Sequence, residues 1–264
     1  MARNRNKKVV RVESNVAGTP GEPASSREPT WRPTPEAKGK ATRYRVIAML
    51  LWLLAIGGEA ATIFWVLRQD PISMVLLIAA IVVIGALAIG GSVLWKKANR
   101  ADPASRAQPT RFFIQNQLGA IITIIAFLPL IILIFLNKDM DAKQKGIAGG
   151  VAVVLALVAT YFGASFNSPS VEQYDDETQR VIELTGEDLV FWTSAGEVYH
   201  LCEDASAVNL DSADNTIFSG TVGDAHAAGK ERLTLQVDQE ITQCGLDPAA
   251  DSETTGDEAD STDE

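Results

Sequence analysis

Three residues near the C-terminal end of the chain carry side chains that could bind a metal ion or undergo redox chemistry. His200 and Cys202 lie two positions apart, and Cys244 follows much later. Imidazole and thiolate groups are zinc ligands, but a structural zinc site normally has four protein ligands, so Glu203 or Asp204 would have to complete the set. The spacing matches no zinc signature. The same two cysteines could instead form a disulfide or remain as two buried free thiols.

Glu59 is the one ionisable residue deep within a long apolar segment. A charged carboxylate is costly there, so the side chain must face protein or take up a proton. As a functional group it could relay ions or protons or pair with a charged substrate. As a structural group it would be a protonated carboxyl that hydrogen-bonds to a neighbouring helix. The interior of the apolar segments contains no Lys, Arg or His that would complete a relay, so the structural interpretation is favoured.

The sequence contains no recognisable catalytic set. It has no paired carboxylates, no Ser/His/Asp arrangement and no phosphate-binding glycine loop, and it has only two histidines. We therefore predict no catalytic residues, no cofactor and no enzymatic activity.

Four long apolar segments form the frame in which these residues lie. About 20 apolar residues cross a ~30 Å hydrocarbon core as a helix. The predicted spans are residues 45–67, 72–95, 112–136 and 146–166. Because the segments are apolar on every face and are joined by short charged loops, they predict an all-α transmembrane region, a four-helix bundle.

Charge is distributed unevenly along the chain. Residues 1–44 hold ten Lys or Arg against four Glu, whereas residues 170–264 hold 24 Asp or Glu against three basic residues. The acidic region argues against nucleic-acid binding by the C-terminal domain, because such binding needs clustered Lys and Arg. The basic arm could contact nucleic acid, but its position before a span favours contact with anionic lipid, so no nucleic-acid partner is predicted. The expected partners are the lipid bilayer, which the basic arm would touch, and a protein that binds the acidic domain. Glycines four apart, Gly146 and Gly150, fit close packing between spans or a homo-oligomer.

The basic residues of the loops predict which side of the membrane each end faces. The loop between spans 2 and 3 holds five of them, Lys96, Lys97, Arg100, Arg106 and Arg111. Because Lys and Arg resist translocation, this loop and the N-terminus are predicted to be cytoplasmic. Four crossings return the chain to the same side, so the C-terminus of this multi-pass cell-membrane protein is also predicted to be cytoplasmic. In that reducing compartment two buried free thiols are the expected state of Cys202 and Cys244, whereas a disulfide between them would fit an extracytoplasmic domain. The state of the two cysteines therefore tests the predicted orientation.

Residues 167–246 predict a small acidic α/β (α+β) domain. We expect a connector helix from Ser170 to Leu184, then a hairpin of strands at residues 188–193 and 197–201. A short helix over residues 222–228, with His226 on its solvated surface, should end at Gly229. Residues 233–244 fit either a strand or a helix. Residues 1–44 and 247–264 have little to bury, so both termini are predicted to be disordered.

Part of this pattern resembles a group of bacterial four-span membrane proteins that has no established activity. The similar residues are Trp192-Thr193, Gly196, Tyr199-His200, Ser219 to Val222 with Ala225, and upstream Leu94 to Asn99, Asp102 to Ser105 and Asn137 to Asp139. Members often carry a Cys shortly after the Tyr-His pair and close with Cys-x-x-Cys, which implies a metal site or a redox pair. This chain has Ala205 in place of the first Cys, and Thr234 and Val237 near the closing pair.

Three functions are compatible with the sequence. The favoured hypothesis is an anchored, non-enzymatic membrane protein whose acidic domain binds a partner or senses a condition. One alternative is a small transporter or channel component that uses Glu59. The other is a metal- or redox-responsive domain built on His200, Cys202 and Cys244.

Overall fold

The computed structural model describes residues 8–12, 31–211 and 215–246 of the chain. The chain folds into two compact units. One unit is Pro35–Val171, and the other combines Met1–Thr34 with Glu172–Glu264. The second unit is thus built from segments at both ends of the chain.

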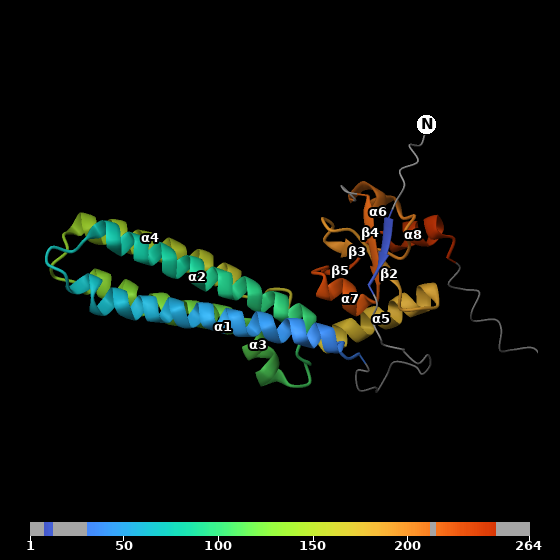
Figure 1. Ribbon diagram of the computed structural model, residues 1–264, viewed down its shortest axis with the longest axis horizontal. Coiled ribbons are helices and arrows are strands. Elements are labelled where there is room, and N and C mark those ends of the chain that lie inside the picture. The colour runs from blue at the N-terminus through green and yellow to red at the C-terminus, as the bar shows by residue number, and fades with distance from the viewer. Residues whose placement is uncertain (1–7, 13–30, 212–214, 247–264) are drawn as a thin grey trace, which may run out of the picture. The chain divides into compact units, whose positions relative to one another are not determined.

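The first unit consists of four long helices, which Figure 1 shows side by side. They are α1 (Pro35–Phe64), α2 (Met74–Ala101), α3 (Pro109–Leu136) and α4 (Ala142–Gly163), with one turn of 3-10 helix, η1 (Val66–Arg68), after α1. All four are long and apolar enough to cross a membrane, so the prediction of four helical spans is confirmed. Helix α1 begins ten residues before the predicted span, since its first turns are polar and precede the apolar stretch.

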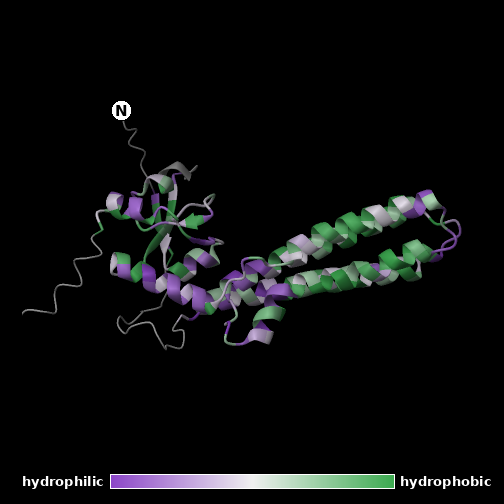
Figure 2. Cartoon of the chain, turned by 180° about the vertical axis from the view of Figure 1, so that it is seen from behind, coloured by the Kyte–Doolittle hydropathy of each residue, from purple (hydrophilic) through white to green (hydrophobic). Residues whose placement is uncertain are grey.

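The helices bury a narrow apolar seam and leave most of their apolar surface exposed. Helix α2 packs against the other three, and Leu77 and Ile81 on it are fully buried. On the outer faces Leu53 is 66% exposed, Val75 81% and Leu157 67%. Figure 2 shows hydrophobic residues along the helices and hydrophilic ones near their ends. Water would not tolerate so large an apolar surface, whereas lipid tails match it. The chain is therefore a four-span membrane protein.

Polar contacts join Arg45, about three turns into α1, to the loop between α2 and α3. Arg45 Nη1 lies 2.6 Å from Asp102 Oδ2, and Nη2 donates to the Asp102 carbonyl at 2.8 Å. Gln115 Nε2 donates to the same carbonyl at 2.9 Å, while the Gln115 carbonyl accepts from Trp95 and Asn99. The Gln115 side chain is buried against this loop.

The second unit is a small mixed domain with two sheets. Its helices are α5 (Val171–Thr185), α6 (Ser206–Asp211), α7 (Val222–Ala227) and α8 (Val237–Cys244); its strands are β1 (Lys8–Arg11), β2 (Val190–Trp192), β3 (Val198–Tyr199), β4 (Thr216–Gly220) and β5 (Arg232–Leu233). The strand order is β1-β4-β2 in one sheet and β3-β5 in the other. An antiparallel bridge between Phe191 and His200 closes the predicted hairpin. The α/β character, the connector helix and the short helix before Gly229 are confirmed.

The core of this domain lies between α5, α7, α8 and the strands. Its buried residues include Val181, Val190, Trp192 and Tyr199. Thr221 caps α7 through a reciprocal pair of hydrogen bonds with Asp224. These local signals explain why the helix begins where the sequence predicts.

The N-terminal arm is the main correction to the predicted fold. The prediction that residues 1–44 are one disordered arm is wrong for residues 8–11, which pair with β4, and for residues 35–44, which are helical. Trp31 also belongs to the domain: its N–H donates to Asp175 Oδ1 at 2.9 Å, and its ring meets Tyr174 edge-on. The pairing joins residues far apart in sequence, so local patterns could not predict it. The predicted disorder of residues 1–7, 13–30 and 247–264 lies outside the described residues.

Candidate functional site

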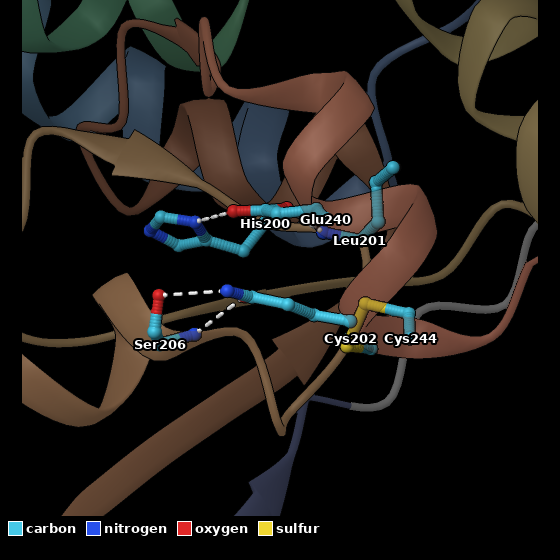
Figure 3. The surroundings of a disulfide bond; sticks show 7 residues. His200, Leu201, Cys202, Ser206, Glu240 and Cys244 are labelled. Atoms are coloured by element: carbon cyan, nitrogen blue, oxygen red, sulfur yellow. Dashed lines mark hydrogen bonds and ion pairs between the residues drawn. A yellow bond between two sulfur atoms is a disulfide. The ribbon is translucent and has the colours of Figure 1, made fainter.

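The two cysteines are bonded to each other. Cys202 and Cys244 form a disulfide with their Cα atoms 5.9 Å apart (Figure 3). Cys202 lies in the segment that follows β3, and Cys244 is the last residue of α8. The expectation of two free thiols is therefore wrong in this structure. The physical reason is that α8 folds back onto the segment after β3, which sequence spacing does not predict.

Beside the disulfide, a buried hydrogen-bonded pair of side chains holds α8 against the same segment. His200 Nδ1 lies 2.6 Å from Glu240 Oε1, and both side chains are 3% exposed. The second carboxylate oxygen accepts the Leu201 N–H at 2.9 Å. The carboxylate of Glu240 is thus bonded through both oxygens, which offsets its desolvation. His200, which the sequence suggests as a metal ligand, instead has a structural partner on α8.

A third contact fixes the end of α8 next to the disulfide. Gln243 Oε1 accepts the Ser206 N–H at 3.0 Å, and Gln243 Nε2 donates to Ser206 Oγ at 3.2 Å. Helix α8 is therefore attached by one covalent bond and two sets of polar contacts. Both cysteines are half-buried, so the disulfide is not sealed within the core.

The candidate zinc ligands do not form a cluster. Within residues 8–12, 31–211 and 215–246, no group of three or more His, Cys, Asp or Glu side chains could hold a metal ion. The sulfur atoms bond to each other, and Glu203 and Asp204 are exposed. The arrangement supports a two-electron thiol–disulfide change more directly than metal binding.

A second buried network, which was not predicted from the sequence, surrounds Glu177 on α5. The Glu177 carboxylate accepts from His226 Nε2 at 2.7 Å, from the Tyr199 hydroxyl and from Gln173. Burial acts to raise the pKa of Glu177, but the hydrogen bonds and the charge of His226 outweigh it and hold the pKa below its ordinary value. Burial raises the pKa of Tyr199, and the neighbouring carboxylate raises it further.

His226 lies in the interior, so its predicted surface position is wrong. It is 1% exposed, and its ring stacks on Tyr174 with centroids 3.7 Å apart. Its Nδ1 faces the Lys230 carbonyl at 2.9 Å. One face of α5 carries Tyr174, Glu177 and Val181 at helical spacing. From this spacing one could have predicted that α5 buries this face against another element.

Two more ionisable residues help to shape the domain, Lys230, which is buried, and Asp188, which is half-buried. Lys230 donates to the carbonyls of Thr193 at 2.6 Å and Gly196 at 2.5 Å, which holds the turn between β2 and β3. Burial lowers the pKa of Lys230. Asp188 accepts the Val222 N–H at 2.8 Å, and burial raises its pKa to about 6.

Glu59 makes a contact between two spans. The side chain is 5% exposed and accepts the Leu130 N–H at 3.2 Å. Leu130 follows Pro129, which interrupts the hydrogen bonding of α3. The contact agrees with the structural interpretation of Glu59 as a group that joins α1 to α3.

The fold defines a class of protein, a four-span membrane protein with a small mixed domain fastened by a disulfide. No family model, curated protein or solved structure matches the chain.

Proposed function

We propose that the chain is a membrane-anchored sensing protein whose domain responds to thiol oxidation through Cys202 and Cys244. The observation that carries the proposal is the disulfide between Cys244, at the end of α8, and Cys202, after β3. The spans act as the anchor. The position of α8 is the feature that a protein partner recognises.

We further propose that both ends of the chain lie in the cytoplasm. The five basic residues between α2 and α3, with Arg43 and Arg45 before the first apolar stretch, favour this orientation. The pairing of β1 with β4 supports a common side for the two ends, as four crossings require. In a reducing compartment disulfides are usually transient, and they serve redox sensing or catalysis. The half-burial of both cysteines fits a bond that forms and breaks.

The proposed switch is a balanced two-electron exchange. Two thiols at Cys202 and Cys244 lose two protons and two electrons, and a low-molecular-weight disulfide accepts them and leaves as two thiols. In the opposite direction a thiol reductant restores both cysteines. The bond closes a loop with a sequence separation of 42 residues.

This chain lacks cysteines at the positions where the proteins it resembles carry them, and this difference also supports a role for its own disulfide. Their cysteines are replaced here by Ala205, Thr234 and Val237, all of which are buried. Val237 packs in the same apolar cluster as Tyr199. We infer that the cross-link which a metal would provide in those proteins is provided in this chain by the disulfide.

The test measures the number of free thiols in the full chain within living cells. Cells are quenched with acid before and after a pulse of diamide, and the protein is alkylated with a maleimide polymer that slows its migration. We expect two alkylated thiols before the pulse, none after it, and two again after recovery. The Cys202→Ser variant is the control and should show one thiol throughout. A bond that stays oxidised in growing cells, or two thiols that survive the pulse, would overturn the proposal.

A further inference from the structure

Strand β1 is a short segment at the edge of the three-stranded sheet. It runs parallel to β4, with Lys8 opposite Thr216 and Arg11 opposite Ser219 (Figure 1). Two further backbone bonds extend the ladder, Lys8 N–H to the Asn215 carbonyl at 3.1 Å and Val12 N–H to the Ser219 carbonyl at 2.7 Å. Without β1, the main-chain groups of this edge of β4 would be open to another strand.

The side chains of β1 contribute little to its attachment. Lys8, Val9, Arg11 and Val12 are exposed, and only Val10 is half-buried. The strand is therefore held chiefly by main-chain hydrogen bonds, which is the mode by which a sheet edge binds an extended peptide. Main-chain bonds of this kind are equally available to the same segment of another molecule.

Charge favours the binding of this segment to this domain. Residues 1–12 hold five basic residues and no acidic one, whereas residues 171–246 hold 16 acidic residues against three basic ones. Opposite charges steer association and suppress wrong partners. Each chain carries both the basic segment and the acidic domain.

The length of the connection allows exchange between neighbours. Residues 13–30 separate β1 from Trp31, the next described residue, which is attached to α5 by its hydrogen bond to Asp175. Eighteen residues reach up to about 60 Å when extended, which exceeds the ~25–30 Å width expected of a domain of this size. Four-span anchoring holds the domains of all copies on the same side of one membrane.

We propose that the edge of β4 is a strand-binding site shared between copies, so that residues 8–11 of one chain pair with β4 of a second copy. Two chains that exchange strands form a closed two-fold dimer in which each basic segment lies on the partner's acidic domain. The proposal goes beyond redox sensing and does not rest on it.

The test uses cross-linking of register partners in the full chain within its native membrane. Two differently tagged chains are co-expressed, one carrying Lys8→Cys and the other Thr216→Cys, and a short bismaleimide is added without reductant. We expect a product containing both tags. The matched control replaces Thr216→Cys with Arg232→Cys, an exposed position in the other sheet, and should give at least tenfold less product.

Three further measurements make the result decisive. The double variant Lys8→Cys/Thr216→Cys reports pairing within one chain; if it cross-links only internally, and the mixed chains give no product, exchange is refuted. A dimer that survives deletion of residues 1–12 also contradicts the proposal, because another surface would then hold it. The wild-type chain treated alike reports separately on the native cysteines, since it reacts only if they are not bonded to each other.

Discussion

At the scale of single residues, the domain is unusual in how many ionisable groups it buries. Glu177, Glu240, His200 and His226 are joined in two pairs, and Lys230 binds backbone carbonyls. Removing one member of such a pair leaves the polar group of the other without its partner in the interior, which is more costly than losing a surface pair. These residues therefore determine the stability of the domain more than its many exposed acids do.

Asp188 should couple the stability of the domain to pH. Burial raises the pKa of Asp188 from 3.8 to about 6. The charge of Asp224 acts in the same direction, whereas the hydrogen bond from the Val222 N–H acts against it. An acid whose pKa is raised on folding contributes stability below its unfolded pKa, and that stability is lost as pH rises through the folded pKa. We predict that Asp188→Asn stabilises the domain by about 2 kcal/mol at pH 8 and has no effect near pH 4. Pulse proteolysis in urea on the detergent-solubilised chain measures this, and an equal effect at both pH values would refute the assignment.

Glu177→Gln should destabilise the domain. The amide keeps the size of the side chain but removes the negative charge that faces His226 and Tyr199. We expect a loss of about 2 kcal/mol in the free energy of unfolding, less than for a fully buried pair because the carboxylate is partly exposed. Glu183→Gln, an exposed change on the same helix, is the control. Equal stability of the two variants would show that the network around His226 contributes nothing.

At the scale of elements, α8 depends on its attachments. It has only eight residues, too few to persist as an isolated helix. The disulfide is its covalent attachment, while Glu240 and Gln243 supply the polar ones. Under the proposed thiol–disulfide change, we therefore expect α8 rather than the strands to respond.

Reduction of the disulfide should loosen α8 selectively. We predict that amide hydrogens of residues 237–244 exchange at least tenfold faster in the reduced chain, while those of β2 and β4 change little. Hydrogen-exchange mass spectrometry of the full chain provides the comparison. Thr242→Ser, which leaves the disulfide intact, should behave like the wild type. Uniform acceleration throughout the domain would instead indicate that the bond stabilises the whole fold.

In the bundle, the contact between Glu59 and α3 gives a separate prediction. Gln in place of Glu59 can still accept the Leu130 N–H, whereas Ala cannot. We expect Glu59→Gln to keep the melting temperature of the purified chain within a few degrees and Glu59→Ala to lower it clearly. If Glu59→Gln abolishes a measurable ion or proton flux in vesicles while the protein stays folded, the structural role is insufficient and the transporter hypothesis regains support.

At the scale of the whole molecule, the sequence predicts what depends on local pattern. The four spans follow from length and hydropathy, and α7 follows from its capping residue and Gly229. The pairing of Lys8 with Thr216 and the bond between Cys202 and Cys244 join distant segments, and neither leaves a periodic signal. Burial of His226 depends on α5 packing against α7. The spacing on α5 indicates that this helix has a buried face, but it does not indicate that α7 is the element that covers it.

The most direct test of the account is the side of the membrane on which Cys202 and Cys244 react. Intact cells are treated with a reductant that crosses membranes, washed, and labelled with either an impermeant or a permeant maleimide. We predict that only the permeant reagent labels the two cysteines, because a redox-responsive domain must face the reducing compartment. Labelling by the impermeant reagent would contradict the account, since it would make the disulfide a permanent bond of a domain on the outer face.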